Sequence, residues 1–221
     1  MTESKRFNVL NCGRRFGKDV LGIDLLVNTA LEGFPTAWLS PTYKNMTDVW
    51  RSLIDILQPV TQRRSEQEHR LELINKAAVE LWSMEQPDTI RGKAYKRVII
   101  NEAASAQNLQ SSWEMVVRPT LTDYKGDAWF LSTPKGFNYF KTLYDRGQDE
   151  DQPDWASWTF PTVTNPYIDP EEIEAARLVL PEDIFAQEYL AAFLSDATTV
   201  FRRLLIAAVL KPSERLTSIS M

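Results

Sequence analysis

Near its N-terminus the chain passes from a short apolar run, residues 7–10, through a glycine-bearing loop into a helix-like run. The connecting residues 11–19 read NCGRRFGKD. A strand, a loop ending in Gly-Lys and a helix together form the arrangement that wraps a nucleotide's phosphates. Backbone N–H groups and the positive end of the helix face the anion, and Lys18 reaches the β- and γ-phosphates. An ordinary strand-to-helix turn with an incidental lysine is the alternative.

A second apolar run, Val98-Ile99-Ile100, ends in Asn101-Glu102 some eighty residues later. At this point of the chain a P-loop ATPase carries its metal-binding and water-activating acids. Glu102 is therefore the candidate catalytic acid, and an acid favoured by a helix N-terminus is the alternative. Because parallel strands end at one edge of a sheet, we expect Lys18 and Glu102 to lie within roughly 10 Å of each other.

The loop departs from its usual form at two positions that bear on a metal ion. Cys12 stands where the first glycine is usual, and Asp19 stands where Ser or Thr is usual. The apolar run at residues 98–100 ends in Asn101, where Asp is expected. The carboxylate has thus moved from one side of the expected Mg²⁺ to the other, and we interpret Asp19 and Asn101 as the metal ligands. The alternative is that both changes weaken Mg²⁺ binding and turnover.

The remaining apolar runs alternate with helix-like segments, which is typical of a parallel α/β sheet flanked by helices. A helix is predicted over 18–31, with Val20, Leu21, Ile23, Leu25 and Leu26 largely buried. A second helix follows Thr42 as N-cap and ends at Pro59. Strands are predicted at 37–39, 98–100, 127–131 and 155–160, a hairpin over 70–83, helices at 170–179 and 182–193, and an exposed loop at 147–154.

Composition sets the limits on function. The 221 residues carry a net charge of −5 and one cysteine, which suits a single domain in a reducing cytoplasm without disulfides. No apolar stretch is long enough for a signal peptide or membrane span, so we expect no membrane partner. The single histidine, His69, lies in a polar run and is given no catalytic or metal role. Any contact with nucleic acid must come from local basic clusters, at 14–18, 63–70 and 91–97.

Taken together, these segments resemble the large (ATPase) subunit of tailed-phage DNA-packaging terminases. The similar segments lie in order over roughly residues 5–201: Gly13 to Lys18, Val98 to Ala104, Arg118 to Leu121, Phe130 to Gly136, Asn165 to Tyr167 and Gln187 to Tyr189. The resemblance implies a P-loop NTPase of the ASCE type that uses ATP and Mg²⁺. It implies an ATPase domain over residues 1–197, with 198–221 a linker or stub where a nuclease domain would begin. No nuclease activity is expected.

The resemblance also implies residue roles and partners. The loop from Cys12 to Asp19, including Gly13, Arg14, Arg15, Phe16, Gly17 and Lys18, would bind the nucleotide, and Ser132 and Thr133 would sense the γ-phosphate. Arg91 is a candidate arginine finger for a neighbouring subunit, with a surface or DNA-contacting arginine as the alternative. Expected partners are duplex DNA, a portal protein, a small terminase subunit and further copies in a ring, although the isolated chain should be a monomer. The expected location is the cytoplasm of an infected or lysogenic bacterial host.

Two rival functions remain open. A nucleotide-binding remnant of a terminase, with little or no turnover, is favoured by the Asp19 and Asn101 pair. A phosphotransferase could use the same loop, but it would need an arginine-rich lid over an acceptor site, and the sequence contains no such segment.

Overall fold

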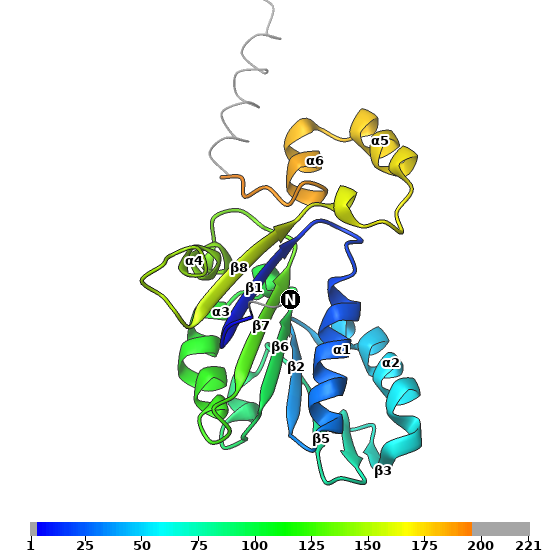
Figure 1. Cartoon of the computed structure of the whole chain (residues 1–221), viewed down its shortest axis with the longest axis vertical. Helices are drawn as coiled ribbons and strands as arrows, with labels where there is room; N and C mark the ends of the chain where they lie inside the picture. Colours follow the sequence, from blue (N-terminus) through cyan, green and yellow to red (C-terminus); the bar gives the residue numbers. More distant parts are fainter. Residues whose placement is uncertain (1–3, 196–221) are drawn as a thin grey trace, which may run out of the picture.

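Eight strands form one sheet in the computed structural model, which describes residues 4–195 (Figure 1). Their order in the sheet is β3-β4-β5-β2-β6-β7-β1-β8. The pairs β3–β4 and β4–β5 are antiparallel, and every neighbouring pair from β5 onward in this order is parallel. The strands are β1 (Phe7–Cys12), β2 (Thr36–Ser40), β3 (Thr61–Ser65), β4 (Arg70–Leu73), β5 (Ala78–Ser83), β6 (Arg97–Asn101), β7 (Asp127–Ser132) and β8 (Trp155–Phe160). The predicted linker or stub at 198–221 lies outside the described residues.

Helices cover both faces of this sheet (Figure 1). One side carries α1 (Lys18–Leu31) and α2 (Thr47–Leu57), and the other carries α3 (Leu109–Ser112) and α4 (Tyr139–Arg146). Beyond one end of the strands lie α5 (Pro170–Val179) and α6 (Glu182–Glu188). Short helical turns complete the chain: η1 (Tyr43–Met46), η2 (Gln58–Val60), η3 (Pro87–Ile90), η4 (Ala103–Ser105), η5 (Trp113–Val117), η6 (Arg118–Leu121) and η7 (Thr162–Thr164).

The central strands are buried on both faces because their side chains alternate between two cores. In β7, Ala128 and Phe130 join the core on the α4 side, whereas Trp129 and Leu131 join the core on the α1 side. Helix α1 approaches the sheet most closely at Gly22, where a Cβ atom would lie 2.7 Å from Leu131 Cδ1. This close packing fixes the start of α1 over the end of the central strands.

The predicted α/β fold with a mostly parallel, helix-flanked sheet is confirmed, and α1 begins and ends where the sequence predicts. The burial predicted for Val20 is wrong, since this side chain is 73% exposed at the mouth of a pocket. Thr42 precedes η1 and makes no capping hydrogen bond, and α2 begins only at Thr47. The last predicted helix is shorter than expected and ends at Glu188. The sequence analysis missed β3, α3 and α4.

Within residues 4–195 no helix combines the length and apolarity needed to cross a membrane.

Candidate functional site

The loop between β1 and α1 turns sharply at the carboxyl edge of the sheet. Arg15 and Gly17 adopt left-handed conformations, with φ of 59° and 100°. Helix α1 begins at Lys18 directly after Gly17, which supplies no side-chain cap. The first N–H groups and the positive end of the helix dipole therefore face an open pocket, as an anion-binding helix N-terminus requires.

The segment after β8 holds this loop in place. Gly13 N donates to Phe160 O at 2.9 Å, and Arg14 N donates to Glu188 O at 2.7 Å. The Thr162 hydroxyl donates to Arg14 O at 2.8 Å, and the Asn165 amide donates to Arg15 O at 2.7 Å. The loop is thus shaped by residues about 150 positions away in the sequence.

The Arg14 side chain also contacts Glu188, in addition to the backbone bond between the two residues. Its Nε atom lies 2.9 Å from Glu188 Oε2, and both residues line the pocket. Sequence reasoning placed Glu188 in a predicted helix and in a segment similar to the family, but gave it no role. Nothing in its local pattern indicates that it contacts the loop.

Lys18 and Glu102 meet across the pocket. Lys18 Nζ lies 2.8 Å from Glu102 Oε1, well inside the expected bound of about 10 Å. Burial alone would lower the pKa of Lys18, but the Glu102 carboxylate, helped by Asp19, raises it above its ordinary value. Lys18 therefore stays protonated and positively charged at the helix N-terminus.

Asp19 and Asn101 form a second pair beside the first. Burial raises the pKa of the Asp19 carboxyl and Glu102 adds to that rise, whereas Lys18 and the neighbouring Asn101 side chain oppose it. Asn101 is 3% exposed, and its Oδ1 atom has no hydrogen-bond partner among the described residues. An unpartnered buried carbonyl oxygen next to a carboxylate is the donor set that Mg²⁺ prefers.

The pair fits a metal ion that arrives with a phosphate ligand. No cluster of three or more His, Cys, Asp or Glu side chains suited to a metal occurs within residues 4–195. A nucleotide-bound Mg²⁺ does not need such a cluster, because it takes one or two protein ligands and completes its shell with phosphate oxygens and water. Asp19 and Asn101 satisfy that smaller requirement.

The end of β7 completes the pocket. Thr133 lines it, whereas the Ser132 hydroxyl is fully buried, accepts from Ala104 N at 3.0 Å and donates to Thr133 O at 2.9 Å. The cavity has a volume of about 850 Å³. Its lining comes from the loop and α1, from the turn after β6, from the segment after β7 and from α6: Arg14, Arg15, Gly17, Lys18, Asp19, Val20, Glu102, Ser105, Thr133, Pro134, Lys135, Gln187 and Glu188.

Three of the predicted loop residues lie beneath the pocket and do not line it. Burial raises the pKa of the Cys12 thiol to about 12, so this cysteine is a neutral core residue. Gly13 packs against Thr162, and Phe16 stacks on Phe160 with ring centroids 4.8 Å apart. These residues shape the loop, while Arg14, Arg15 and Gly17 to Asp19 face the cavity.

A profile of the family described as "Terminase large subunit, T4likevirus-type, N-terminal" matches residues 9–208. The chain belongs to this family.

Curated relatives agree with this assignment. The large terminase subunit of Escherichia phage T5 is 32% identical over 192 residues, covering 85% of this chain and 44% of the phage protein. The large terminase subunit of Thermus virus P23-45 is 32% identical over 152 residues, covering 60% of this chain and 30% of the relative. This terminase domain thus spans less than half the length of the curated relatives that it matches.

Solved structures share the fold. The large terminase ATPase domain of Thermus phage P74-26 aligns with a TM-score of 0.71 at 23% identity, covering 86% of this chain and 89% of that one. The large terminase of another thermophilic bacteriophage, in complex with ADP, also aligns with a TM-score of 0.71, at 15% identity over 86% of this chain and 49% of that one.

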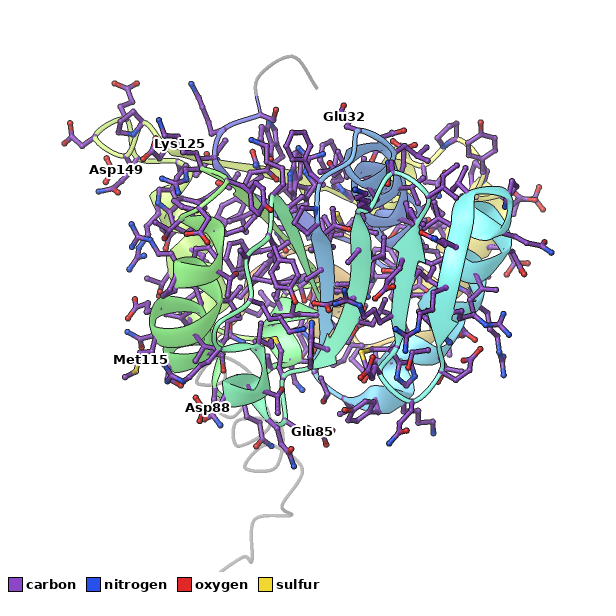
Figure 2. The ribbon with its side chains drawn as sticks, turned by 90° about the horizontal axis from the view of Figure 1, so that it is seen from below. Glu32, Glu85, Asp88, Met115, Lys125 and Asp149 are labelled. Atoms are coloured by element: carbon purple, nitrogen blue, oxygen red, sulfur yellow. The ribbon has the colours of Figure 1, made fainter. Side chains whose placement is uncertain are left out.

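Arg91 lies outside the pocket. It follows η3, forms an ion pair with Asp88 at 2.6 Å and donates to Met115 O at 3.4 Å. Figure 2 labels Asp88 and Met115, which lie near each other at the periphery of the molecule. The Arg91 side chain is 56% exposed, so it is available to a neighbouring molecule and makes no contact with Lys18 or Glu102 in its own chain.

Proposed function

We propose that the terminase domain hydrolyses ATP and couples that reaction to the translocation of duplex DNA. The observation that carries the proposal is the meeting of Lys18 and Glu102 at 2.8 Å across a cavity of about 850 Å³ at the carboxyl edge of the sheet. This is the edge where open α/β sheets bind their ligands, and the cavity is in the size range of small-molecule sites.

Binding of the triphosphate relies on the loop and the start of α1. The Lys18 ammonium and the N–H groups at the helix start supply charge and hydrogen bonds to the β- and γ-phosphates. Arg14 and Arg15 lie at the mouth of the same cavity and add positive charge there. The Glu102 carboxylate, freed from Lys18 by the competing phosphate, is then available to the attacking water.

Asp19 and Asn101 would hold a Mg²⁺ ion, which neutralises charge on the phosphate oxygens. Asp19 supplies the negative charge, and Asn101 supplies the carbonyl oxygen that lacks a partner.

Glu102 carries the chemical step. Its carboxylate orients the attacking water and accepts its proton as the bond to the γ-phosphorus forms and the bond to the β,γ-bridging oxygen breaks. Thr133, on the pocket wall, is the residue suited to sense the γ-phosphate, and Ser132 acts behind it through Ala104.

The partners of the larger assembly are proposed from the family resemblance. We assign the partners as duplex DNA, a portal protein, a small terminase subunit and further copies in a ring, in the cytoplasm of an infected or lysogenic bacterial host.

The exposed Arg91 is assigned as the arginine finger that completes a neighbouring subunit's site. Mixing wild-type subunits with Arg91→Ala subunits under assembling conditions tests this assignment. Activity that falls only in proportion to the mutant fraction, with no rescue in Glu102→Gln and Arg91→Ala mixtures, would refute it.

The central experiment separates binding from hydrolysis. Lys18→Ala should weaken nucleotide binding, because it removes a charge-assisted contact to the phosphates. Glu102→Gln should bind nearly as well as the wild type while releasing little phosphate, because it removes only the base. Glu32→Gln, at the exposed C-terminal end of α1, is the matched control and should change neither quantity. Equal loss of binding in Lys18→Ala and Glu102→Gln would show that Glu102 is structural or a metal ligand.

The second candidate function is a nucleotide-binding remnant without turnover, and the unusual Asp19 and Asn101 pair favours it. Restoring the usual residues with Asp19→Thr and Asn101→Asp decides between the two. If the native pair supports hydrolysis, the double variant releases phosphate at a similar rate or more slowly. A large gain in turnover, with Mg²⁺-dependent binding of ATP, would favour the remnant.

A further inference from the structure

The backbone at Glu102 is held in a conformation that an L-residue adopts reluctantly. Its φ and ψ are 50° and 39°, in the left-handed region, directly before η4. For a residue other than glycine this conformation is unfavourable, because Cβ comes too close to the following carbonyl oxygen. It persists only where neighbouring contacts enforce it, and such contacts at a catalytic position belong to the mechanism.

Those contacts converge on Ala104, two residues later. Its N–H group donates to Ser132 Oγ at 3.0 Å, and its carbonyl accepts from Asn138 Nδ2 at 2.8 Å. Both polar groups of this one residue are thus bound by side chains from the end of β7 and the segment that follows it. The turn itself is closed by Ser105 N, which donates to Glu102 O at 2.9 Å.

Asn138 also begins α4. Its Oδ1 atom accepts from Phe140 N at 3.0 Å and so caps the helix, while Nδ2 serves Ala104. The two bonds together define the orientation of the amide, since an exchange of O and N would break both. Because Phe140 and Leu143 are fully buried, α4 is anchored in the core and Asn138 moves only with it.

From these contacts we infer that Asn138 is a positioning residue for the hydrolytic step. By donating to the Ala104 carbonyl, Asn138 stabilises the strained turn that orients Glu102 towards the pocket. It thereby couples the orientation of Glu102 to the position of the start of α4. The inference rests on the proposed function, because Glu102 must be the base. It assigns a role to a side chain that lies outside the lining of the pocket.

The two functions of the Asn138 amide can be separated by substitution. Asn138→Ser keeps a good N-cap acceptor and removes the donor to Ala104, and Asn138→Asp keeps the cap and places an acceptor against the Ala104 carbonyl. The matched control is Asp169→Ala, because Asp169 caps α5 in the same way, accepting from Glu171 N at 2.9 Å, and touches no part of the turn. All variants are made in the full chain.

Turnover and nucleotide binding form the first measurement. We expect kcat for phosphate release to fall about tenfold or more in both Asn138 variants, since a displacement near 1 Å of a catalytic group can cost a hundredfold. The Kd for ATP with Mg²⁺ should stay close to wild type, and the Tm of Asn138→Ser should fall by only about 2–4 °C, as expected for one lost hydrogen bond. Asp169→Ala should lower Tm while kcat stays unchanged. An unchanged kcat in Asn138→Ser, or a kcat loss matched by Asp169→Ala, would overturn the proposal.

Amide hydrogen exchange forms the second measurement and needs no turnover. Exchange over residues 102–106 should be about tenfold faster in Asn138→Ser and unchanged in Asp169→Ala. If the wild type released no phosphate, the proposed function would fail, and this exchange pattern would still decide whether Asn138 holds the turn. Equal exchange in the wild type and Asn138→Ser would overturn the positioning role.

Discussion

Replacing Gly13 with alanine tests whether the segment after β8 holds the phosphate loop. A Cβ atom at this position would lie 2.5 Å from Thr162 Oγ1, 2.6 Å from Tyr189 O and 2.7 Å from Thr162 N. Two of these atoms are backbone, and they form a hydrogen bond of 2.7 Å with each other. The methyl group therefore cannot be accommodated by a side-chain rotation.

The cost can be worked from these contacts. Overpacking a tight site costs about 1–3 kcal/mol. If the segment parts from the loop instead, the bonds from Arg14 N to Glu188 O and from Thr162 Oγ1 to Arg14 O are lost, at about 1 kcal/mol each. The two routes together predict a loss of about 1–3 kcal/mol in the free energy of unfolding, which in a domain of this size lowers Tm by roughly 2–12 °C.

Urea unfolding measures this loss, with Gly33→Ala as the control. Gly33 has a φ of 95° and no atom within 4 Å of its would-be Cβ, so its substitution carries only backbone strain of about 1–2 kcal/mol. Gly13→Ala should also weaken nucleotide binding, whereas Gly33→Ala should not. A Gly13→Ala protein no less stable than Gly33→Ala, with unchanged nucleotide affinity, would refute the reasoning.

Two further predictions concern the buried groups Glu80 and Cys12. Glu80 is 3% exposed and receives hydrogen bonds from Arg70, Lys93 and Tyr95, so Glu80→Gln should destabilise the fold by about 3 kcal/mol at pH 7. Burial opposes the shift, but these partners lower the pKa of Glu80 below its ordinary value. The stability that the Glu80 carboxylate contributes is therefore present above the ordinary pKa and is lost as pH falls through the lowered pKa. Urea unfolding should show the stability difference between wild type and Glu80→Gln narrowing below about pH 4.5. Cys12, fully buried with a pKa of about 12, should resist thiol reagents at pH 8 in the folded protein and react fully after denaturation.

The core of the site could be predicted from local patterns. An apolar run followed by Gly-Lys, and another followed by Asn101-Glu102, each indicate a buried strand that ends in polar residues. Parallel strands bring such ends to one edge, which is why Lys18 and Glu102 were expected to be close. Helix α1 was equally predictable, because its apolar residues recur with helical spacing and Gly33 and Pro35 follow its end.

The contacts that shape the site could not be predicted in the same way. Thr162, Asn165 and Glu188 are polar residues at turns and helix ends, and they contact the loop across about 150 to 175 residues. Such residues carry no periodicity that distinguishes them from ordinary exposed positions. Asn138 did carry a local signal, since a capping residue precedes Phe140 and Leu143 at helical spacing, but its second bond to Ala104 depends on the fold alone.

The unusual residues of the loop and of β6 are best understood as one change. Taken separately, Asp19 adds a carboxylate where a hydroxyl is usual, and Asn101 removes one where an aspartate is usual. The side chain of Asn101 lowers the pKa of the Asp19 carboxyl, and its own carbonyl oxygen is buried without a partner. Two aspartates at these positions would repel each other beside Glu102, whereas Asp19 with Asn101 keeps one negative charge and two oxygen donors. We therefore propose a relocated metal site, and the reciprocal pair Asp19→Thr with Asn101→Asp is the substitution that tests it.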